Sequence, residues 1–341
     1  MLKLNRVAIF SDLHLGLYGN SENWHDTALK WASWMREELR KQNIEDVLFL
    51  GDFFDNRSEI SVQTIHVASQ IIEMFEEFNL FVIVGNHDAY YKDRSDVHSL
   101  GMMRKHTNIT LIESNLEFEK FGKRFLFVPW NNEVPDKPYD YIFGHFEIQT
   151  FNMNAQTVCT HGLQPSDLLK GKKTAVFSGH FHTRNSKSYK EGTINYVGSC
   201  FPMDFSDVGN TKGYHILDVT TGDLEFVENT VSPTFVRLYT SKLKTTQSVD
   251  VKNQIVKLIV DEEIDGDILE TVKVSISKQA PWQFKIDHNT KTQVTIDNVE
   301  VIESIEIDKM FEEFVGYLNL PEEQTKEVWA ELSDLLQSSK K

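Results

Sequence analysis

Apolar residues in the first third of the chain alternate between continuous runs and a spacing of three and four. The runs at residues 7–10, 47–50 and 80–84 are typical of strands buried on both faces. Between them lie two helical stripes, one of Trp24, Ala28, Trp31, Met35 and Leu39 and one of Ile65, Ala68, Ile72 and Phe75. Alternating strands and helices predict crossover connections and a buried, largely parallel sheet.

After residue 109 short strands become dense and helical spacing nearly disappears. Strands are predicted at 125–128, 141–143, 174–177, 194–197, 214–219 and 224–228. This density predicts a mixed sheet or two sheets packed face to face.

The composition changes near Ser232. Beyond it, Val272, Val274 and Ile276 alternate with polar residues, which predicts a half-exposed strand. Two helices are predicted to close the chain. Their apolar residues are Met310, Phe311, Phe314 and Leu318 in the first and Val328, Trp329, Leu332, Leu335 and Leu336 in the second. This pair is either a self-packed hairpin or an anchor for a partner coiled coil.

The composition is that of a globular protein. Its 341 residues, 40% hydrophobic and 25% charged, allow two domains. No apolar run approaches the roughly 20 residues that span a bilayer, and the run at 7–10 is too short for a signal-peptide core. Cys159 and Cys200 form no Cys-x-x-Cys pair, which excludes a disulfide framework and a zinc knuckle. We therefore expect a cytoplasmic protein.

The net charge of −16, from 35 basic and 51 acidic residues, taken alone argues against nucleic-acid binding. Bound divalent metals or a basic partner subunit would reverse this argument, because either would offset the clustered carboxylates.

Five short polar motifs lie at or just after predicted strand ends, where loops on a rigid sheet converge. They are Asp12-Leu13-His14, Gly51-Asp52-Phe53-Phe54-Asp55, Gly85-Asn86-His87-Asp88, Gly144-His145 and Gly179-His180-Phe181-His182. Oxygen and imidazole donors without thiolate suit Mn, Fe or Zn. Two such metals about 3.5–4 Å apart hydrolyse phosphate esters in many enzymes. On an extended segment, Asp12 and His14 would face the same side, as would His180 and His182.

In this order the motifs resemble the calcineurin-like metallophosphoesterases. Asp12-Leu13-His14-Leu15-Gly16, and the segment from Asn195 to Tyr214, resemble the SbcD/Mre-type DNA repair nucleases, most of all a bacteriophage recombination nuclease subunit. Gly-Asn-His-Asp, in place of the Gly-Asn-His-Glu of protein phosphatases, favours the nuclease and phosphodiesterase branch. Phe53 stands where the family commonly has Leu or Val.

The resemblance implies an α/β fold, a four-layer α/β/β/α sandwich with a small C-terminal α+β capping domain and a helical tail. The implied domains are a nuclease domain at 1–230, a capping and DNA-binding domain at 231–300, and C-terminal helices at 301–341 that dock a partner ATPase.

The resemblance also implies the roles of the motif residues. One metal is held by Asp12, His14, Asp52 and His182, and the other by the bridging Asp52 with Asn86, His145 and His180. His87 contacts the scissile phosphate and protonates the leaving oxygen, and Asp88 orients His87. The implied cofactors are two divalent ions, Mn²⁺ or alternatively Mg²⁺.

The implied function is a DNA nuclease, a double-strand exonuclease and single-strand endonuclease in recombination, repair and replication. Its implied partners are DNA and an SMC-like ATPase of the SbcC/Rad type, with a nuclease homodimer inside a heterotetramer and no membrane. The alternatives are a phosphodiesterase or phosphatase acting on a small nucleotide, and a non-catalytic binding module.

Several residues keep two interpretations. Tyr90, Lys92 and Arg94 are candidate DNA contacts or a solvated face. Asp55 is a turn residue or a support for Asp52. His161 competes with His145 as a ligand, and we prefer His145 because it follows a strand and a glycine.

Overall fold

The computed structural model describes residues 5–153, 157–171, 173–243 and 250–288. The two predicted C-terminal helices lie outside these residues. The described residues belong to one compact unit, Met1–Thr290. No helix among them combines the length and hydropathy needed to cross a bilayer.

The first sheet contains the three predicted N-terminal strands. Its order is β12 (Leu224–Glu228), β11 (Gly213–Asp218), β1 (Arg6–Phe10), β2 (Asp46–Phe49), β3 (Asn79–Ile83) and β4 (Ile109–Ile112). Strands β1 to β4 are parallel. The apolar runs predicted this for β1, β2 and β3, whereas β4 was not predicted. Strand β11 is antiparallel to β1.

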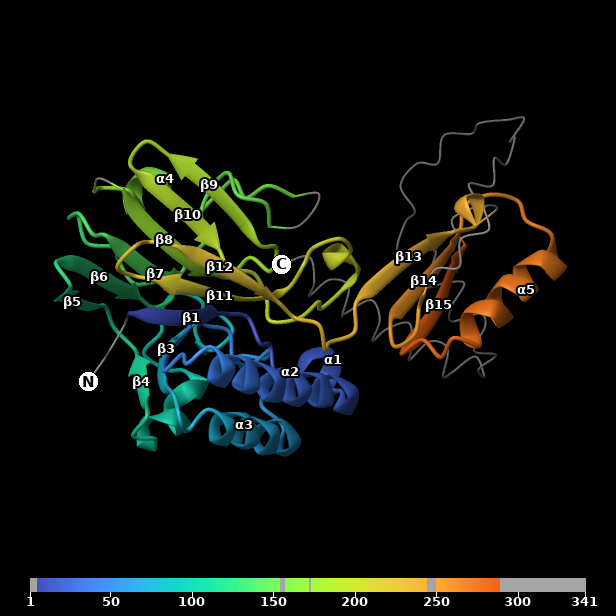
Figure 1. Ribbon diagram of the computed structural model, residues 1–341, viewed down its shortest axis with the longest axis horizontal. Coiled ribbons are helices and arrows are strands. Elements are labelled where there is room, and N and C mark those ends of the chain that lie inside the picture. The colour runs from blue at the N-terminus through green and yellow to red at the C-terminus, as the bar shows by residue number, and fades with distance from the viewer. Residues whose placement is uncertain (1–4, 154–156, 172, 244–249, 289–341) are drawn as a thin grey trace, which may run out of the picture. The chain divides into compact units, whose positions relative to one another are not determined.

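Two long helices cover one face of this sheet, α2 (Glu22–Lys41) and α3 (Val62–Met74), after the short α1 (Leu17–Asn20) (Figure 1). The predicted stripe of α2 is buried throughout. In α3 the buried face runs through Val67, Ala68, Ile71 and Ile72. The prediction that Ile65 belongs to this face is wrong, because its side chain is 41% exposed.

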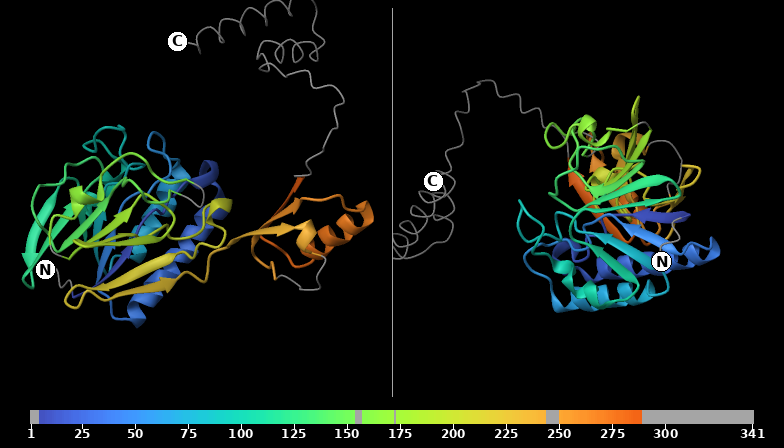
Figure 2. Two further views of the ribbon diagram at one scale, coloured as in Figure 1. Left: turned by 90° about the horizontal axis from the view of Figure 1, so that it is seen from above. Right: turned by 90° about the vertical axis from the view of Figure 1, so that its left-hand side faces the viewer.

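The second sheet packs against the other face of the first. Its order is β5 (Leu116–Lys120), β6 (Lys123–Val128), β7 (Tyr141–His145), β8 (Thr174–Gly179), β10 (Gly192–Tyr196) and β9 (Asn185–Tyr189). Two sheets face to face, with helices outside, are the layers predicted for the sandwich, and Figure 2 shows the helices α2 and α3 on one side of the strands.

The alternation of side chains explains the layers. Phe125 and Phe127 of β6 meet Val7 and Ile9 of β1 between the sheets. Leu126 of β6 points the other way, toward the loops between β7 and β8 and the short helix α4 (Pro165–Leu168). The central strands of both sheets are therefore buried on both faces.

A third, parallel sheet of β13 (Phe235–Tyr239), β14 (Ile255–Val260) and β15 (Gln283–His288) follows, with its own core and helix α5 (Gly266–Ser277). The predicted strand at Val272–Ile276 is wrong, because this segment lies inside α5. Asp265 caps the helix by accepting from the amides of Asp267 and Ile268. Leu269, Val272 and Ile276 then share one helical face, whereas Val274 is exposed; three alternating apolar residues were too few to distinguish the two periods. Three 3₁₀ turns complete the described elements, η1 (Ser99–Lys105), η2 (Phe205–Asp207) and η3 (Thr240–Lys242).

Candidate metal centre

The five polar motifs meet at the carboxyl ends of β1, β2, β3, β7 and β8. Parallel strands bring these ends to one edge of each sheet, and the two sheets face each other there. Backbone bonds join the loops across the centre: the amide of Asp12 donates to Gly51 at 3.0 Å and the amide of Trp130 donates to Val84 at 2.9 Å.

The backbone at the centre is not extended, so the prediction that extended segments carry the Asp-x-His and His-x-His pairs is wrong. Asp12, His14, Asp52 and His180 have φ values of 56°, 46°, 59° and 90°, in the left-handed region. Non-glycine residues rarely adopt this conformation, and at functional sites surrounding contacts hold it in place. Here the amides of Leu13 and His14 both donate to the Asp52 carbonyl, at 2.9 and 3.1 Å.

Two glycines allow the loops to approach this closely. A Cβ at Gly85 would collide with the Asp52 backbone and carboxylate. A Cβ at Gly179 would meet Ser11 Oγ, and would lie 2.8 Å from His145 Nδ1. Glycine is required at both positions because atoms of the neighbouring loops occupy the space that a side chain would need.

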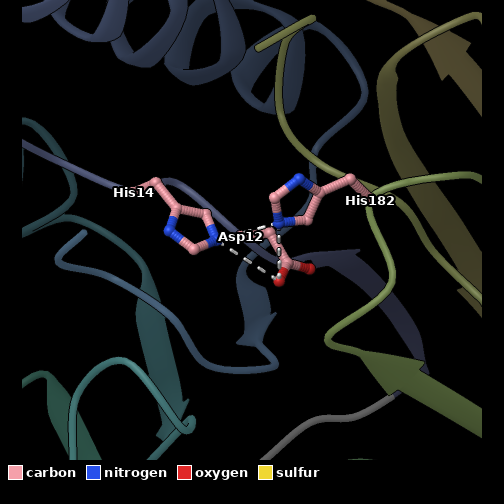
Figure 3. A group of neighbouring side chains, drawn as sticks. All are labelled: Asp12, His14 and His182. Atoms are coloured by element: carbon pink, nitrogen blue, oxygen red, sulfur yellow. Dashed lines mark hydrogen bonds and ion pairs between the residues drawn. The ribbon is translucent and has the colours of Figure 1, made fainter. Parts of the chain in front are cut away.

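The first group of possible ligands is Asp12, His14 and His182 (Figure 3). The Nε2 atoms of the two imidazoles lie 3.0 Å apart. They lie 3.9 and 4.0 Å from Asp12 Oδ1, toward which both rings point. Two imidazole nitrogens and a carboxylate that converge in this way fit a divalent cation, because its charge would satisfy all three donors.

The second group is Asp52, His145 and His180, with Asn86 beside it. Asn86 Oδ1 lies 2.7 Å from His145 Nε2 and 2.9 Å from His180 Nδ1. Asp52 Oδ2 lies 3.3 Å from His145 Nε2 and 3.6 Å from His14 Nε2 of the first group. One carboxylate oxygen therefore faces both groups. All seven predicted ligands are brought together.

Burial and mutual charge set the protonation of these side chains. Burial lowers the pKa of His145, but the charge and hydrogen bond of Asp52 outweigh it and raise that pKa to about 9. Burial raises the pKa of Asp52, but His145 and His14 outweigh it and hold the pKa well below its usual value. Burial and the neighbouring charge of Asp52 raise the pKa of Asp12, although His145 and His14 oppose the shift. For His182, burial and the neighbouring His14 lower the pKa, so its ring is neutral and suited to bind a cation.

Three of the four histidines in the two groups have a second partner that orients the ring. Asp55 Oδ1 lies 3.2 Å from His14 Nδ1, so Asp55 supports His14 and not Asp52. The Leu50 carbonyl lies 2.7 Å from His145 Nδ1. Glu147 Oε1 lies 3.8 Å from His180 Nε2.

His182 is held through its backbone. Lys212 Nζ donates to the His182 carbonyl at 2.6 Å and pairs with Asp207, and both of these charged side chains are buried. Sequence reasoning missed Glu147 and Lys212. The position of Glu147 two residues after His145 was a weak signal, and Lys212 lies in the segment from Asn195 to Tyr214 that carries part of the family resemblance.

His87 and Asp88 have different surroundings. The His87 amide donates to Asp52 Oδ1 at 2.7 Å, and His87 Nδ1 lies 2.5 Å from the Asp55 carbonyl. The Asp88 carboxylate instead accepts the amides of Gly85, Asp52, Phe53 and Phe54, at 2.9–3.2 Å. The predicted contact from Asp88 to the His87 ring is replaced by the Asp55 carbonyl, and Asp88 ties the loop after β2 to the loop after β3.

The aromatic ring of Trp130 borders the second group. The Trp130 ring lies 5.1 Å from the His180 ring and 5.9 Å from the His145 ring, a neighbour that sequence reasoning missed. Asn131 Nδ2 donates to the Lys92 carbonyl at 2.8 Å. This bond connects the loop of Tyr90, Lys92 and Arg94 to the segment that contains Trp130. Tyr90 is 51% exposed, and Arg94 lies over the Tyr91 ring and pairs with Asp96.

His161 lies outside both groups. Its side chain is 65% exposed and pairs with Glu147 at 3.2 Å. His145, in contrast, is fully buried between Asn86 and Asp52.

Comparison with known proteins agrees with this geometry. "Exonuclease subunit 1" of Enterobacteria phage T4 is 24% identical over 323 residues, which cover 91% of this chain and 92% of the relative. The family model described as calcineurin-like phosphoesterase matches residues 5–184, more than half of the chain and the part that contains both ligand groups. Such a family implies divalent metal ions, which the donors of both groups fit. The chain belongs to the calcineurin-like phosphoesterase family.

Proposed function

We propose that this protein is a metal-dependent DNA nuclease with a dinuclear centre. The observation that carries the proposal is the Asp52 carboxylate, which faces both ligand groups through one oxygen. The first ion would be held by Asp12, His14, Asp52 and His182. The second would be held by Asp52, Asn86, His145 and His180. Both would be Mn²⁺, with Mg²⁺ as the alternative.

When bound, the two ions would polarise the phosphate and lower the pKa of the attacking water. The chain itself supplies the proton for the leaving oxygen. Because the Asp55 carbonyl can only accept, His87 Nδ1 must carry hydrogen. His87 Nε2 is then the atom that would hold and donate the proton, and the Asp55 carbonyl would fix its direction.

Two observations favour DNA over a small nucleotide. The relative from phage T4 is an exonuclease subunit by name, and it aligns with nearly the whole chain. The exposed Tyr90 and its neighbours Lys92 and Arg94 follow directly after His87, where they would contact a polynucleotide. Residues 231–300 would extend this contact as a capping domain.

The assembly we propose is a nuclease homodimer with an SMC-like ATPase that residues 301–341 bind. The word "subunit" in the relative's name supports a partner chain. Val62 and Ile65 on the exposed side of α3, at 85% and 41% exposure, are candidates for the contact between copies. A partner with basic surface would also offset the net charge of −16.

The test is cleavage of a linear duplex and of a circular single strand by the purified chain, in Mn²⁺, in Mg²⁺ and in chelator. His87→Ser is compared with His66→Ser, a matched change at an exposed histidine of α3. We expect Mn²⁺-dependent cutting that His87→Ser loses and His66→Ser keeps. Turnover of bis-p-nitrophenyl phosphate without DNA cutting, also after addition of the ATPase, would establish the small-substrate enzyme instead.

A further inference from the structure

A third group of potential metal ligands lies beside the centre, and two of its members, Cys159 and His161, take no part in the proposed reaction. It consists of Glu147, Cys159 and His161, whose ligand atoms lie within 4.8 Å of one another. Glu147 Oε1 lies 3.2 Å from His161 Nε2, and Cys159 Sγ lies 3.8 Å from His161 Nδ1. These two distances end on different ring nitrogens, whereas an imidazole gives one nitrogen to an ion. A rotation of the exposed His161 side chain would bring one nitrogen near both partners, as the spacing of about 3.5 Å between the ligand atoms of a tetrahedral zinc ion requires.

The backbone holds these three residues in place. The segment that contains Glu147 pairs with the segment that contains Cys159 and His161. The Cys159 amide donates to Phe151 at 2.8 Å, the Thr150 amide donates to Cys159 at 2.8 Å, and the Leu163 amide donates to Glu147 at 2.8 Å. Gly162 lies between His161 and Leu163. Its φ is 81°, and a Cβ there would collide with the Glu147 backbone. The three donors are therefore presented by a preorganised pair of segments.

We propose that Glu147, Cys159 and His161 bind a third cation of the zinc class. A thiolate, an imidazole and a carboxylate are the donor types that zinc takes, and a thiolate is absent from the two groups of the dinuclear centre. The thiolate and the carboxylate together carry two negative charges, which a dication neutralises. Three protein ligands leave one position open, and the exposed His161 gives the ion a route from solvent.

The competing explanation is a structural turn. Cys159 Sγ donates to the His161 carbonyl at 3.1 Å, and a buried thiol with this acceptor needs no metal. On that explanation, Cys159 would fill space in the core under β7 and β8 and His161 would be a solvent-exposed side chain.

Cobalt(II) titration of the metal-free full-length chain distinguishes the two explanations. Cobalt bound to a thiolate gives a charge-transfer band in the near ultraviolet, whereas cobalt bound only to oxygen and nitrogen does not. We expect this band in wild type, and we expect zinc to remove it. His161→Ala and Cys159→Ser should lose the band, and His161→Ala should bind one equivalent less than wild type.

Cys200→Ala is the matched control, because Cys200 is the other cysteine of the chain and donates to the Ser11 carbonyl. It should keep the band. No band in wild type, a band that survives both Cys159→Ser and His161→Ala, or a band lost only in Cys200→Ala would overturn the third site. His161→Ala keeps the test decisive if Cys159→Ser does not fold, since the His161 side chain is largely exposed. The readout does not depend on hydrolysis of any substrate.

Discussion

Two histidines in this protein are both buried, but their pKa values are shifted in opposite directions. His145 ends β7 in the metal centre and is 1% exposed, and His215 lies in the middle of β11 and is 6% exposed. The carboxylates of Asp52 and Asp12 outweigh burial and raise the pKa of His145 to about 9. Burial, together with the charge of Arg184, lowers the pKa of His215 to about 4.

The difference shows what distinguishes a chemical site from a packed sheet in this fold. Burial penalises the charged form of both rings to a comparable degree. Only at the strand ends do carboxylates from several loops converge, and there the penalty is offset by anions that a metal would share. His215 instead packs against the Phe226 ring in a tilted arrangement, and the Arg184 guanidinium lies over that ring at 3.9 Å. Five predictions test this contrast, in order of decreasing effect.

The largest effect is expected from Asp52→Asn. It removes the one charge that faces both ligand groups, so phosphodiester hydrolysis in Mn²⁺ should fall at least about 10³-fold, or about 4 kcal/mol of transition-state stabilisation. Turnover of bis-p-nitrophenyl phosphate measures this, with Asp136→Asn at an exposed ion pair as the control. Activity within tenfold of wild type would show that Asp52 is not a ligand of the metal centre.

Lys212→Met should lower the free energy of unfolding by about 3–5 kcal/mol, because it leaves Asp207 buried and unpaired. It also frees the His182 carbonyl. Lys170→Met, which breaks the exposed pair with Asp136, should cost less than about 1 kcal/mol. Urea denaturation of both variants gives the comparison, and equal effects would contradict it.

His215 should make the protein less stable in acid. Its folded-state pKa of about 4 lies below its unfolded value, so between these values the unfolded chain binds the extra proton. Stability is complete above about pH 6.5 and falls by about 3 kcal/mol as the pH drops to about 4. Comparison of wild type with His215→Leu by urea denaturation across this range isolates the contribution, which should be absent in the variant.

For His145, the pH dependence of stability has the opposite sign in the metal-free protein. Its folded-state pKa of about 9 lies above the unfolded value. Its contribution is present below about pH 6.5 and is lost as the pH rises through 9. A pH profile of the same slope for both histidines would contradict the contrast.

The smallest effect is expected from Asp55→Asn, which weakens the support of His14 without removing a proposed ligand. Mn²⁺ affinity should fall by about 10–100-fold. Isothermal titration calorimetry against Asp136→Asn measures it. An unchanged affinity would show that the 3.2 Å contact does not orient His14.

Local pattern predicted much of the fold. Continuous apolar runs identified β1, β2 and β3, because these strands are buried on both faces. Three- and four-residue spacing identified α2, because one full stripe of this helix is buried. Prediction was wrong at Val272–Ile276, where the cap at Asp265 and the packing of Leu269 favour a helix. Short windows carry too little periodicity to decide such cases.

For the site, the five motifs at strand ends contained all seven residues that converge, and the family resemblance selected these seven as ligands. The two roles that changed are those of Asp55 and Asp88. A one-dimensional motif places Asp88 next to His87, but the carboxylate faces the amides of the loop after β2, about 35 positions away in sequence. Glu147 and Lys212 escaped notice for the same reason.

The sequence by itself determined the donor set, its oxygen and nitrogen chemistry, and the strand ends that carry it, since these follow from composition and short-range period. Only the tertiary structure decided which oxygen faces both groups, which carbonyl orients His87 and which buried histidine meets carboxylates. Those outcomes depend on left-handed turns at Asp12, His14, Asp52 and His180 and on the packing of two sheets. They are contacts between segments distant in the chain, which local pattern does not encode.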